Sequence, residues 1–138
     1  MKFIDTHIHL QDYKSSSTPQ IIAAAQECGV RGFVCLSARE SDWTKVLELS
    51  NVYPEVVPAL GLHPWYARQV SEKWSVTLER LLVQNPRAQV GEAGLDRIKD
   101  SELSPQAEVF QTQIDLAKKY NRVLLIHAVK AAEWLPRF

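Results

Sequence analysis

Two histidines near the amino terminus have the spacing of a metal-binding pair. His7 and His9 lie in the segment FIDTHIHL (residues 3–10), within an apolar pattern that predicts a strand over residues 2–10. Alternate side chains of a strand point to the same face, so both imidazoles and the carboxylate of Asp5 share one face. Two imidazoles at this spacing can bind one metal ion, and Asp5 could orient one of them. An isolated His-x-His pair is more often a solvated strand end, so the rest of the chain decides between these interpretations.

The remaining histidines and one glutamate occupy corresponding places further along the chain. His63, Glu92 and His127 each fall at, or just after, the carboxyl end of an apolar run that predicts a strand. In parallel α/β folds, ligands bind at that edge of the sheet. Imidazole and carboxylate form the ligand set expected for zinc, manganese or iron, and a carboxylate can bridge two ions. The shared placement of the four histidines therefore predicts a site at this edge of the sheet, with Glu92 as a candidate metal ligand beside them.

Each of these residues also has a simpler interpretation. Glu92 lies between two glycines and could be an exposed side chain in a Gly-rich turn, while His127 could be a core histidine bound to a backbone carbonyl. His63 lies in a Gly-Leu-His-Pro turn, where it could hold a substrate oxyanion or phosphate as readily as a metal. Asp96 could orient the groups around Glu92 or hold a substrate group. Either Asp96 or Asp5 could instead cap a helix or turn.

The elements that must position these residues alternate between strand and helix. Strands are predicted over 2–10, 30–37, 56–60, 88–90 and 122–126, and helices beginning at Thr18, at Ser41 or Asp42, near residue 71, at Ser104 and at Ala131. Pro58 predicts an irregular or edge position within its strand. This alternation indicates a single domain (residues 1–138) with a parallel sheet of βα units, either a doubly wound open sheet or part of a (β/α)8 barrel.

Composition and charge narrow the class of protein. Of 138 residues, 46% are hydrophobic and 23% are charged, which is typical of a globular chain. Basic and acidic residues number 16 each, so a nucleic-acid substrate would be bound locally rather than along a broad basic surface. The only cysteines, Cys28 and Cys35, form no disulfide framework, and we expect both to be buried apolar residues in a reducing compartment. Without a secretory signal or an apolar run near ~20 residues, we expect a cytoplasmic location and no membrane partner.

Five motifs in order resemble the TatD-like metal-dependent deoxyribonucleases of the amidohydrolase superfamily. They are DTHIHL (5–10), GLHP (61–64), GEAGLD (91–96), the helix over 106–117 and LIH (125–127), and together they span nearly the whole chain. The resemblance implies a TIM-type (β/α)8 barrel that hydrolyses DNA phosphodiester bonds with a water activated by one or two divalent ions (Mg, Mn or Zn).

The resemblance also implies a role for each matching residue. His7 and His9 would bind the first metal, His127 would bind the second, Glu92 would bridge the two as the catalytic carboxylate, and His63 would lie on the substrate side. The family pattern continues with a further His and an Asp that have no counterpart before Phe138.

The chain offers about four and a half βα units of a barrel that typically needs ~250 residues. We therefore expect a truncated barrel that is catalytically impaired on its own and that self-associates through its unpaired strand edge.

Three functions therefore remain open. The first is an active nuclease whose barrel is completed by further sequence or by a second chain. The second is an inactive relative that retains metal ligands. The third is an amidohydrolase acting on amide, ester or lactone bonds, since the same ligands serve that chemistry and fold does not fix substrate.

Overall fold

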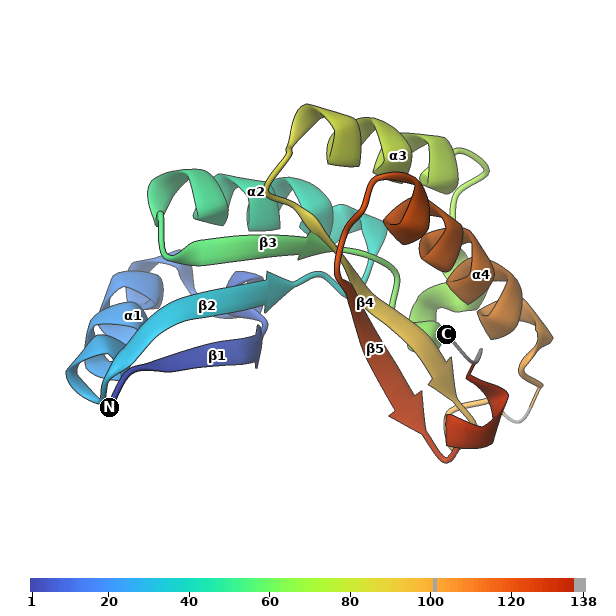
Figure 1. Cartoon of the computed structure of the whole chain (residues 1–138), viewed down its shortest axis with the longest axis horizontal. Helices are drawn as coiled ribbons and strands as arrows, with labels where there is room; N and C mark the ends of the chain where they lie inside the picture. The colour runs from blue at the N-terminus through green and yellow to red at the C-terminus, as the bar shows by residue number, and fades with distance from the viewer. Residues whose placement is uncertain (101, 136–138) are drawn as a thin grey trace.

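The computed structural model describes residues 1–100 and 102–135. In this part of the chain, strands and helices alternate and the strands form one sheet in the order β1-β2-β3-β4-β5, every pair parallel (Figure 1). The elements are β1 (Phe3–Ile8), α1 (Thr18–Glu27), β2 (Val30–Leu36), α2 (Trp43–Val52), β3 (Val56–Leu60), α3 (Trp74–Gln84), β4 (Gln89–Asp96), α4 (Ser104–Lys119) and β5 (Leu124–Val129), with 3₁₀ turns in several connections.

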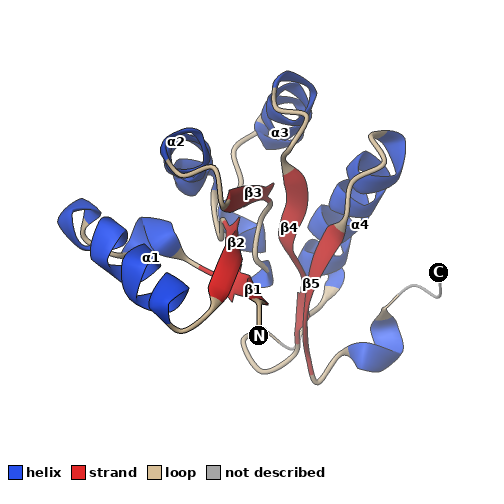
Figure 2. Ribbon diagram, turned by 60° about the vertical axis from the view of Figure 1, so that its left-hand side comes forward, coloured by secondary structure: helices blue, strands red, loops and turns tan. Residues whose placement is uncertain are grey.

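The sheet is curved, and all of the helices named above lie along its convex side (Figure 2). Each strand pairs with the next one in the sequence, which is the order of a (β/α)8 barrel and gives the shape of a half-barrel. A doubly wound sheet would carry helices on both faces, so the barrel alternative of the sequence prediction is the correct one. β1 and β5 form the two edges of the sheet, and its concave side carries the candidate site.

The hydrophobic core fills the layer between the sheet and the helices. Phe33 and Leu60 from the strands and Leu78 and Leu82 from α3 are at most 1% exposed. One face of α4 packs against the sheet, and Val109, Phe110, Ile114 and Ala117 on this face are buried. Fully burying side chains of this size contributes about 1.5–3 kcal/mol each, so this layer fixes the strands whose ends carry the polar site.

β4 and β5 extend further than the sequence predicted. The predictions ended the fourth strand at residue 90 and the fifth at 126, whereas β4 continues to Asp96 and β5 to Val129. Glu92 and His127 therefore lie within strands rather than after them. Gly94 explains the continued pairing: it lies opposite His127 at φ +150°, where a Cβ would come 1.9 Å from the His127 carbonyl oxygen.

Smaller differences concern helix ends and cysteines. The helix predicted from Ala131 is a 3₁₀ turn over Ala132–Trp134, and residues 136–138 lie outside the described residues. Cys35 is buried as expected, but Cys28 is exposed because it follows the last residue of α1. The edge or irregular position predicted at Pro58 was wrong: β3 is the central strand, and Pro58 pairs with Cys35 of β2 in regular register, while pairing with β4 begins at Ala59.

In the described part of the chain, no helix has both the length and the hydropathy needed to cross a bilayer.

Candidate metal centre

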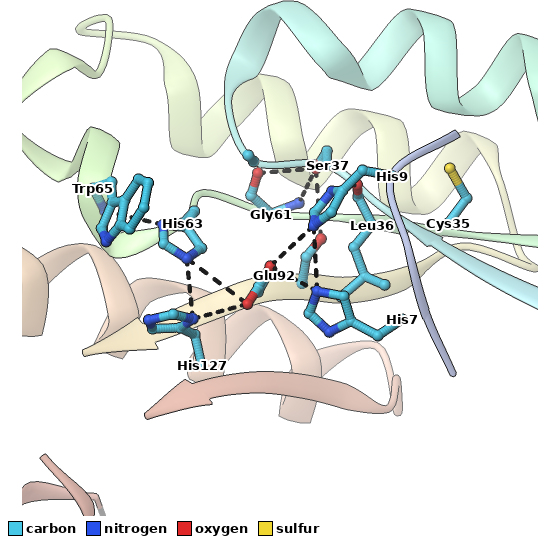
Figure 3. A network of polar contacts seen from close by, with 12 residues as sticks. His7, His9, Cys35, Leu36, Ser37, Gly61, His63, Trp65, Glu92 and His127 are labelled. Atoms are coloured by element: carbon cyan, nitrogen blue, oxygen red, sulfur yellow. Dashed lines mark hydrogen bonds and ion pairs between the residues drawn. The ribbon is translucent and has the colours of Figure 1, made fainter. Parts of the chain in front are cut away.

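One buried carboxylate contacts all four histidines of the chain (Figure 3). Glu92 projects from β4 and is 5% exposed. Its Oε2 atom lies 3.3 Å from Nε2 of His7 and 3.5 Å from Nε2 of His9. Its Oε1 atom lies 3.0 Å from Nδ1 of His127 and 3.8 Å from Nε2 of His63. Each carboxylate oxygen therefore faces its own pair of imidazoles.

The two groups have the composition and spacing of metal ligands. The first set consists of His7, His9 and Glu92, and the second of His63, Glu92 and His127. Within each set, one possible ligand atom per residue lies within 4.8 Å of the others. The paired imidazole nitrogens are 3.2 Å apart in the first set and 3.0 Å apart in the second. Such nitrogen and carboxylate oxygen atoms could hold a divalent cation beside each oxygen of the glutamate, with His7 and His9 on one side and His127 on the other.

The imidazole of His9 is oriented for ligation by the backbone of β2. Its Nδ1 atom lies 2.8 Å from the carbonyl oxygen of Leu36, and only a protonated nitrogen can donate to a carbonyl. The Nε2 atom therefore points its lone pair at the site in the neutral ring. The side chain of Gln11 donates to the same carbonyl at 2.8 Å, which fixes the acceptor in place. Partners of this kind set the tautomer of metal-binding histidines.

Asp96 orients His127 in the same way. The Nε2 atom of His127 lies 3.1 Å from Oδ2 of Asp96, so Nδ1 is left to face Glu92. The same oxygen accepts a hydrogen bond from the indole of Trp65 at 2.8 Å. Oδ1 of Asp96 accepts from two backbone amides of the following turn, so the turn-capping role considered from the sequence is also present.

In the neutral ring of His63, the nitrogen that faces the site carries the proton, unlike in His9 and His127. Its Nδ1 atom accepts a hydrogen bond from the backbone N–H of Trp65 at 3.2 Å, so the proton of the neutral ring is on Nε2, which faces Glu92 and His127. Burial lowers the pKa of His63 to about 4, so the ring is neutral at pH 7. A neutral ring with a proton on the site-facing nitrogen is a hydrogen-bond donor rather than a metal ligand.

The central carboxylate is ionised at neutral pH. Burial by itself raises the pKa of Glu92, but the hydrogen bond with His9 and the neighbouring imidazoles outweigh burial and lower the pKa to about 2. Because His63 is neutral at pH 7, we assign the main stabilisation of the charge to His9. The hydrogen bond from His9 to Glu92 requires a proton on Nε2, so it forms only in the protonated ring of the metal-free protein, and it raises the pKa of His9. For Asp96, burial also raises the pKa, but the indole N–H of Trp65 and the other donors lower it to about 2.

Asp5 does not contact an imidazole among the hydrogen bonds of the described residues. Its Oδ1 atom accepts from the backbone N–H of His7 at 3.0 Å, so the carboxylate acts on the chain that carries His7 rather than on the ring. Strand alternation predicted that Asp5 shares a face with His7 and His9. The carboxylate instead accepts a hydrogen bond from the backbone two residues along the chain, a local bond that aspartate side chains commonly form.

A pocket of about 430 Å³ opens over these groups. Its wall includes the exposed indole of Trp65 and the ring of Tyr66, and the ammonium of Lys99 lies 5.2 Å from the Trp65 ring. The pocket is thus polar on its floor and aromatic at one side. It leaves space beside the glutamate for a substrate that offers both a polar group and an apolar or stacking surface.

The sequence predictions missed several residues that hold the site. Ser37 at the end of β2 donates to the Gly61 carbonyl and accepts from the Gly61 N–H at 3.0 and 2.8 Å. Gln11 and two glutamines of α4 bind backbone groups beside the ligands. The one signal in the sequence was Gln113, a polar residue within an apolar helical face. The serine and Gln11 had none, because their role depends on contacts between distant segments.

Comparison with known proteins identifies the family of the chain. The family model described as "TatD related DNase" matches residues 4–137. The chain is 28% identical to an uncharacterised metal-dependent hydrolase of Haemophilus influenzae, aligned over 100% of this chain and 57% of the relative. It is 29% identical to the 3'-5' ssDNA/RNA exonuclease TatD of Edwardsiella piscicida, over 85% of this chain and 46% of the relative.

The crystal structure of YjjV, a TatD homologue from Escherichia coli, has the same fold. It superposes with a TM-score of 0.87 at 29% identity, covering 96% of this chain and 53% of YjjV. The chain thus spans about half the length of the relatives it matches. With a family model that covers almost every residue and a half-barrel that superposes on a solved homologue, the chain belongs to the TatD-related DNase family.

Proposed function

We propose that this chain carries the metal-binding half of a nuclease that hydrolyses DNA phosphodiester bonds. The observation that carries the proposal is the placement of Glu92, whose two oxygens each face a separate pair of histidines. In this proposal His7 and His9 bind a first divalent ion, Mg, Mn or Zn, and His127 binds a second. Bound ions of this kind lower the pKa of water toward ~7 and supply positive charge beside a phosphate.

The other residues then have distinct tasks. Glu92 holds the two positions at a fixed separation and stays ionised, because its pKa is lowered to about 2. Asp96 keeps the ring of His127 turned toward the glutamate. His63 presents an N–H into the pocket and is placed to donate to a phosphate oxygen.

A nucleic-acid substrate is supported by the pocket and by one relative. The chain has no net charge, so the electrostatic attraction for a phosphate has to come from the site itself. The exposed indole of Trp65 beside Lys99 offers a surface on which a base can stack. The Edwardsiella piscicida relative is named for 3'-5' exonuclease activity on ssDNA and RNA.

A test compares cleavage of a 5′-labelled single-stranded oligonucleotide by the chain and by two variants. Cleavage with Mg²⁺, Mn²⁺ or Zn²⁺ is expected to be slow, because the chain spans about half the length of its relatives. It should disappear in Glu92→Ala and persist in Glu108→Ala, which removes an exposed carboxylate of α4. Failure to bind any of these ions contradicts the proposal. Ion binding without cleavage of DNA favours an inactive metal-binding relative, and cleavage of an ester or amide instead favours a different amidohydrolase.

We further propose that two copies of the chain associate through their strand edges. β1 and β5 are the outer strands of the sheet, and Ile4 on β1 and Ile126 on β5 are 67% and 39% exposed. Because all strands are parallel, β5 of one copy can lie beside β1 of another and continue the order of the sheet. Sedimentation velocity is expected to show a dimer that Ile4→Lys dissociates. A monomer at every concentration tested contradicts this association.

A further inference from the structure

Two buried glutamines of α4 bind backbone groups beside the candidate metal centre. Gln113 is fully buried; its Oε1 accepts from the Leu62 N–H at 2.8 Å and its Nε2 donates to the Leu62 carbonyl at 3.1 Å. Gln106 is 2% exposed and binds Asp96 in the same way, at 2.7 and 3.1 Å. Each carboxamide therefore satisfies both polar backbone atoms of a single residue. We propose that Gln106 and Gln113 are positioning residues of the metal centre.

Their placement connects one helix to two separate parts of the site. The glutamines are seven residues apart, which is two helical turns, so both lie on the face of α4 that packs against the sheet. Leu62 directly precedes His63, and Asp96 contacts the ring of His127. A shift of either carboxamide would therefore move one of the two imidazoles that share Oε1 of Glu92.

The segment before His63 is held from two sides. Ser37 binds both backbone atoms of Gly61, and Gln113 binds both backbone atoms of Leu62. The indole of Trp43 donates to the same Gly61 carbonyl at 3.0 Å. A Cβ on Gly61 would lie 2.7 Å from Oε1 of Gln113, so the absence of a side chain makes room for the carboxamide.

The two glutamines supply hydrogen bonds that apolar residues at these positions could not supply. The rest of the buried face of α4 is apolar, with Val109, Phe110 and Ile114 beside the two amides. An apolar residue of similar volume would fill the space but would leave the backbone N–H and carbonyl groups of Leu62 or Asp96 without these partners, which costs free energy in a buried position. What the amide adds is a fixed direction for the backbone that it binds.

The test uses Gln113→Leu and Gln106→Leu, which keep most of the volume but remove the hydrogen bonds. Gln111→Leu is the matched control, because Gln111 is an exposed residue of the same helix. Ile114→Ala is a second control that lowers stability without touching Leu62 or Asp96. The first readout is the set of imidazole nitrogen and proton resonances of the metal-free chain. We expect Gln113→Leu to shift those of His63 and Gln106→Leu those of His127, with both controls unchanged.

The second readout is the affinity for Co²⁺ measured by its absorption spectrum. Removing groups that orient metal ligands typically weakens binding by about 10–100-fold, and we expect a loss in this range for Gln106→Leu but not for Gln111→Leu. The proposal is overturned if both glutamine variants lower the melting temperature as Ile114→Ala does while every imidazole resonance stays in place.

A measurement on the unmodified chain covers the case in which a variant does not fold. The amide protons of Leu62 and Asp96 should exchange slowly with solvent, as expected for donors to buried acceptors, and exchange at the rate of a fully exposed amide would overturn the proposal. The binding part of the inference rests on the proposed function. If the unmodified chain does not bind Co²⁺, the proposed function fails, whereas the imidazole resonances still decide the positioning role.

Discussion

The Nδ1 atom of His127 lies 3.0 Å from Oε1 of Glu92, although the residues are 35 positions apart in the sequence. The contact follows from the register of two neighbouring parallel strands, in which Gly94 of β4 lies opposite His127 of β5. Side chains two residues apart on a strand share a face, so Glu92 and His127 project into the same side of the sheet. Their contact joins the two groups of candidate ligands.

Replacing the central carboxylate should remove metal binding. Glu92→Gln keeps the shape of the side chain but loses the charge that faces both pairs of imidazoles. We expect the affinity for Mn²⁺ or Zn²⁺, measured by isothermal titration calorimetry, to fall by more than about a hundredfold, beyond the loss typical of a group that only orients a ligand. Glu108→Gln on the exposed side of α4 should bind as the unmodified chain does. Equal affinities for all three proteins would contradict the assignment of Glu92.

The two histidine groups should be separable by stoichiometry. His9→Ala removes a ring that faces Oε2 of Glu92, and His127→Ala removes a ring that faces Oε1. If each oxygen serves its own ion, each variant should lose one equivalent of bound metal and retain the other. Native mass spectrometry in a volatile buffer counts the equivalents directly. Loss of all metal in both variants would instead indicate a single ion shared by the two groups.

A methyl group at Gly94 should separate β4 from β5. Its Cβ would lie 1.9 Å from the His127 carbonyl oxygen, a distance that only backbone movement can relieve, and the residue has φ +150°. We expect Gly94→Ala to lower the free energy of unfolding by about 3 kcal/mol or more in urea denaturation. Gly32→Ala is the control within the same sheet, because its Cβ would meet nothing closer than 3.8 Å. A similar small change in both variants would show that the strands do not approach so closely.

Stability should decline at alkaline pH because of one buried thiol. Burial raises the pKa of Cys35 from 9.0 to about 11, so between these values the unfolded chain releases a proton that the folded chain keeps. The stabilisation is therefore complete below pH 9.0 and is lost as the pH rises to about 11, with a slope of at most about 1.4 kcal/mol per pH unit. Urea midpoints should fall more steeply for the unmodified chain than for Cys35→Ala. Parallel curves would mean that the thiol ionises equally in both states.

Much of the fold was predictable from the sequence because the pattern is local. The apolar runs and helix starts at Thr18 and Ser104 locate the βα units, and the alternation of units requires parallel strands. The ends of β4 and β5 were not predictable in this way. The glycines at residues 91 and 94 were consistent with a Gly-rich turn. In the structure, Gly94 lies within β4 and allows close approach of β5.

The candidate site was also predictable only in part. Histidines and a glutamate after apolar runs could be predicted to meet at one edge, because parallel strands place their carboxyl ends together. The sequence could not predict which ring nitrogen of each histidine faces Glu92. That orientation depends on the Leu36 carbonyl for His9 and on Asp96 for His127. The bond from Asp5 to the backbone of His7 likewise depends on local geometry that the sequence pattern does not specify.

The shared contact with Glu92 also has a mechanical consequence for the curved sheet. In a flat sheet, four strand spacings of about 4.8 Å would place β1 and β5 roughly 19 Å apart. Here His7 of β1 and His127 of β5 both touch one carboxylate on β4. Flattening the sheet would separate these contacts, so a cation bound beside Glu92 would stabilise the curvature. Loss of the cation and fraying of either outer strand would then occur together.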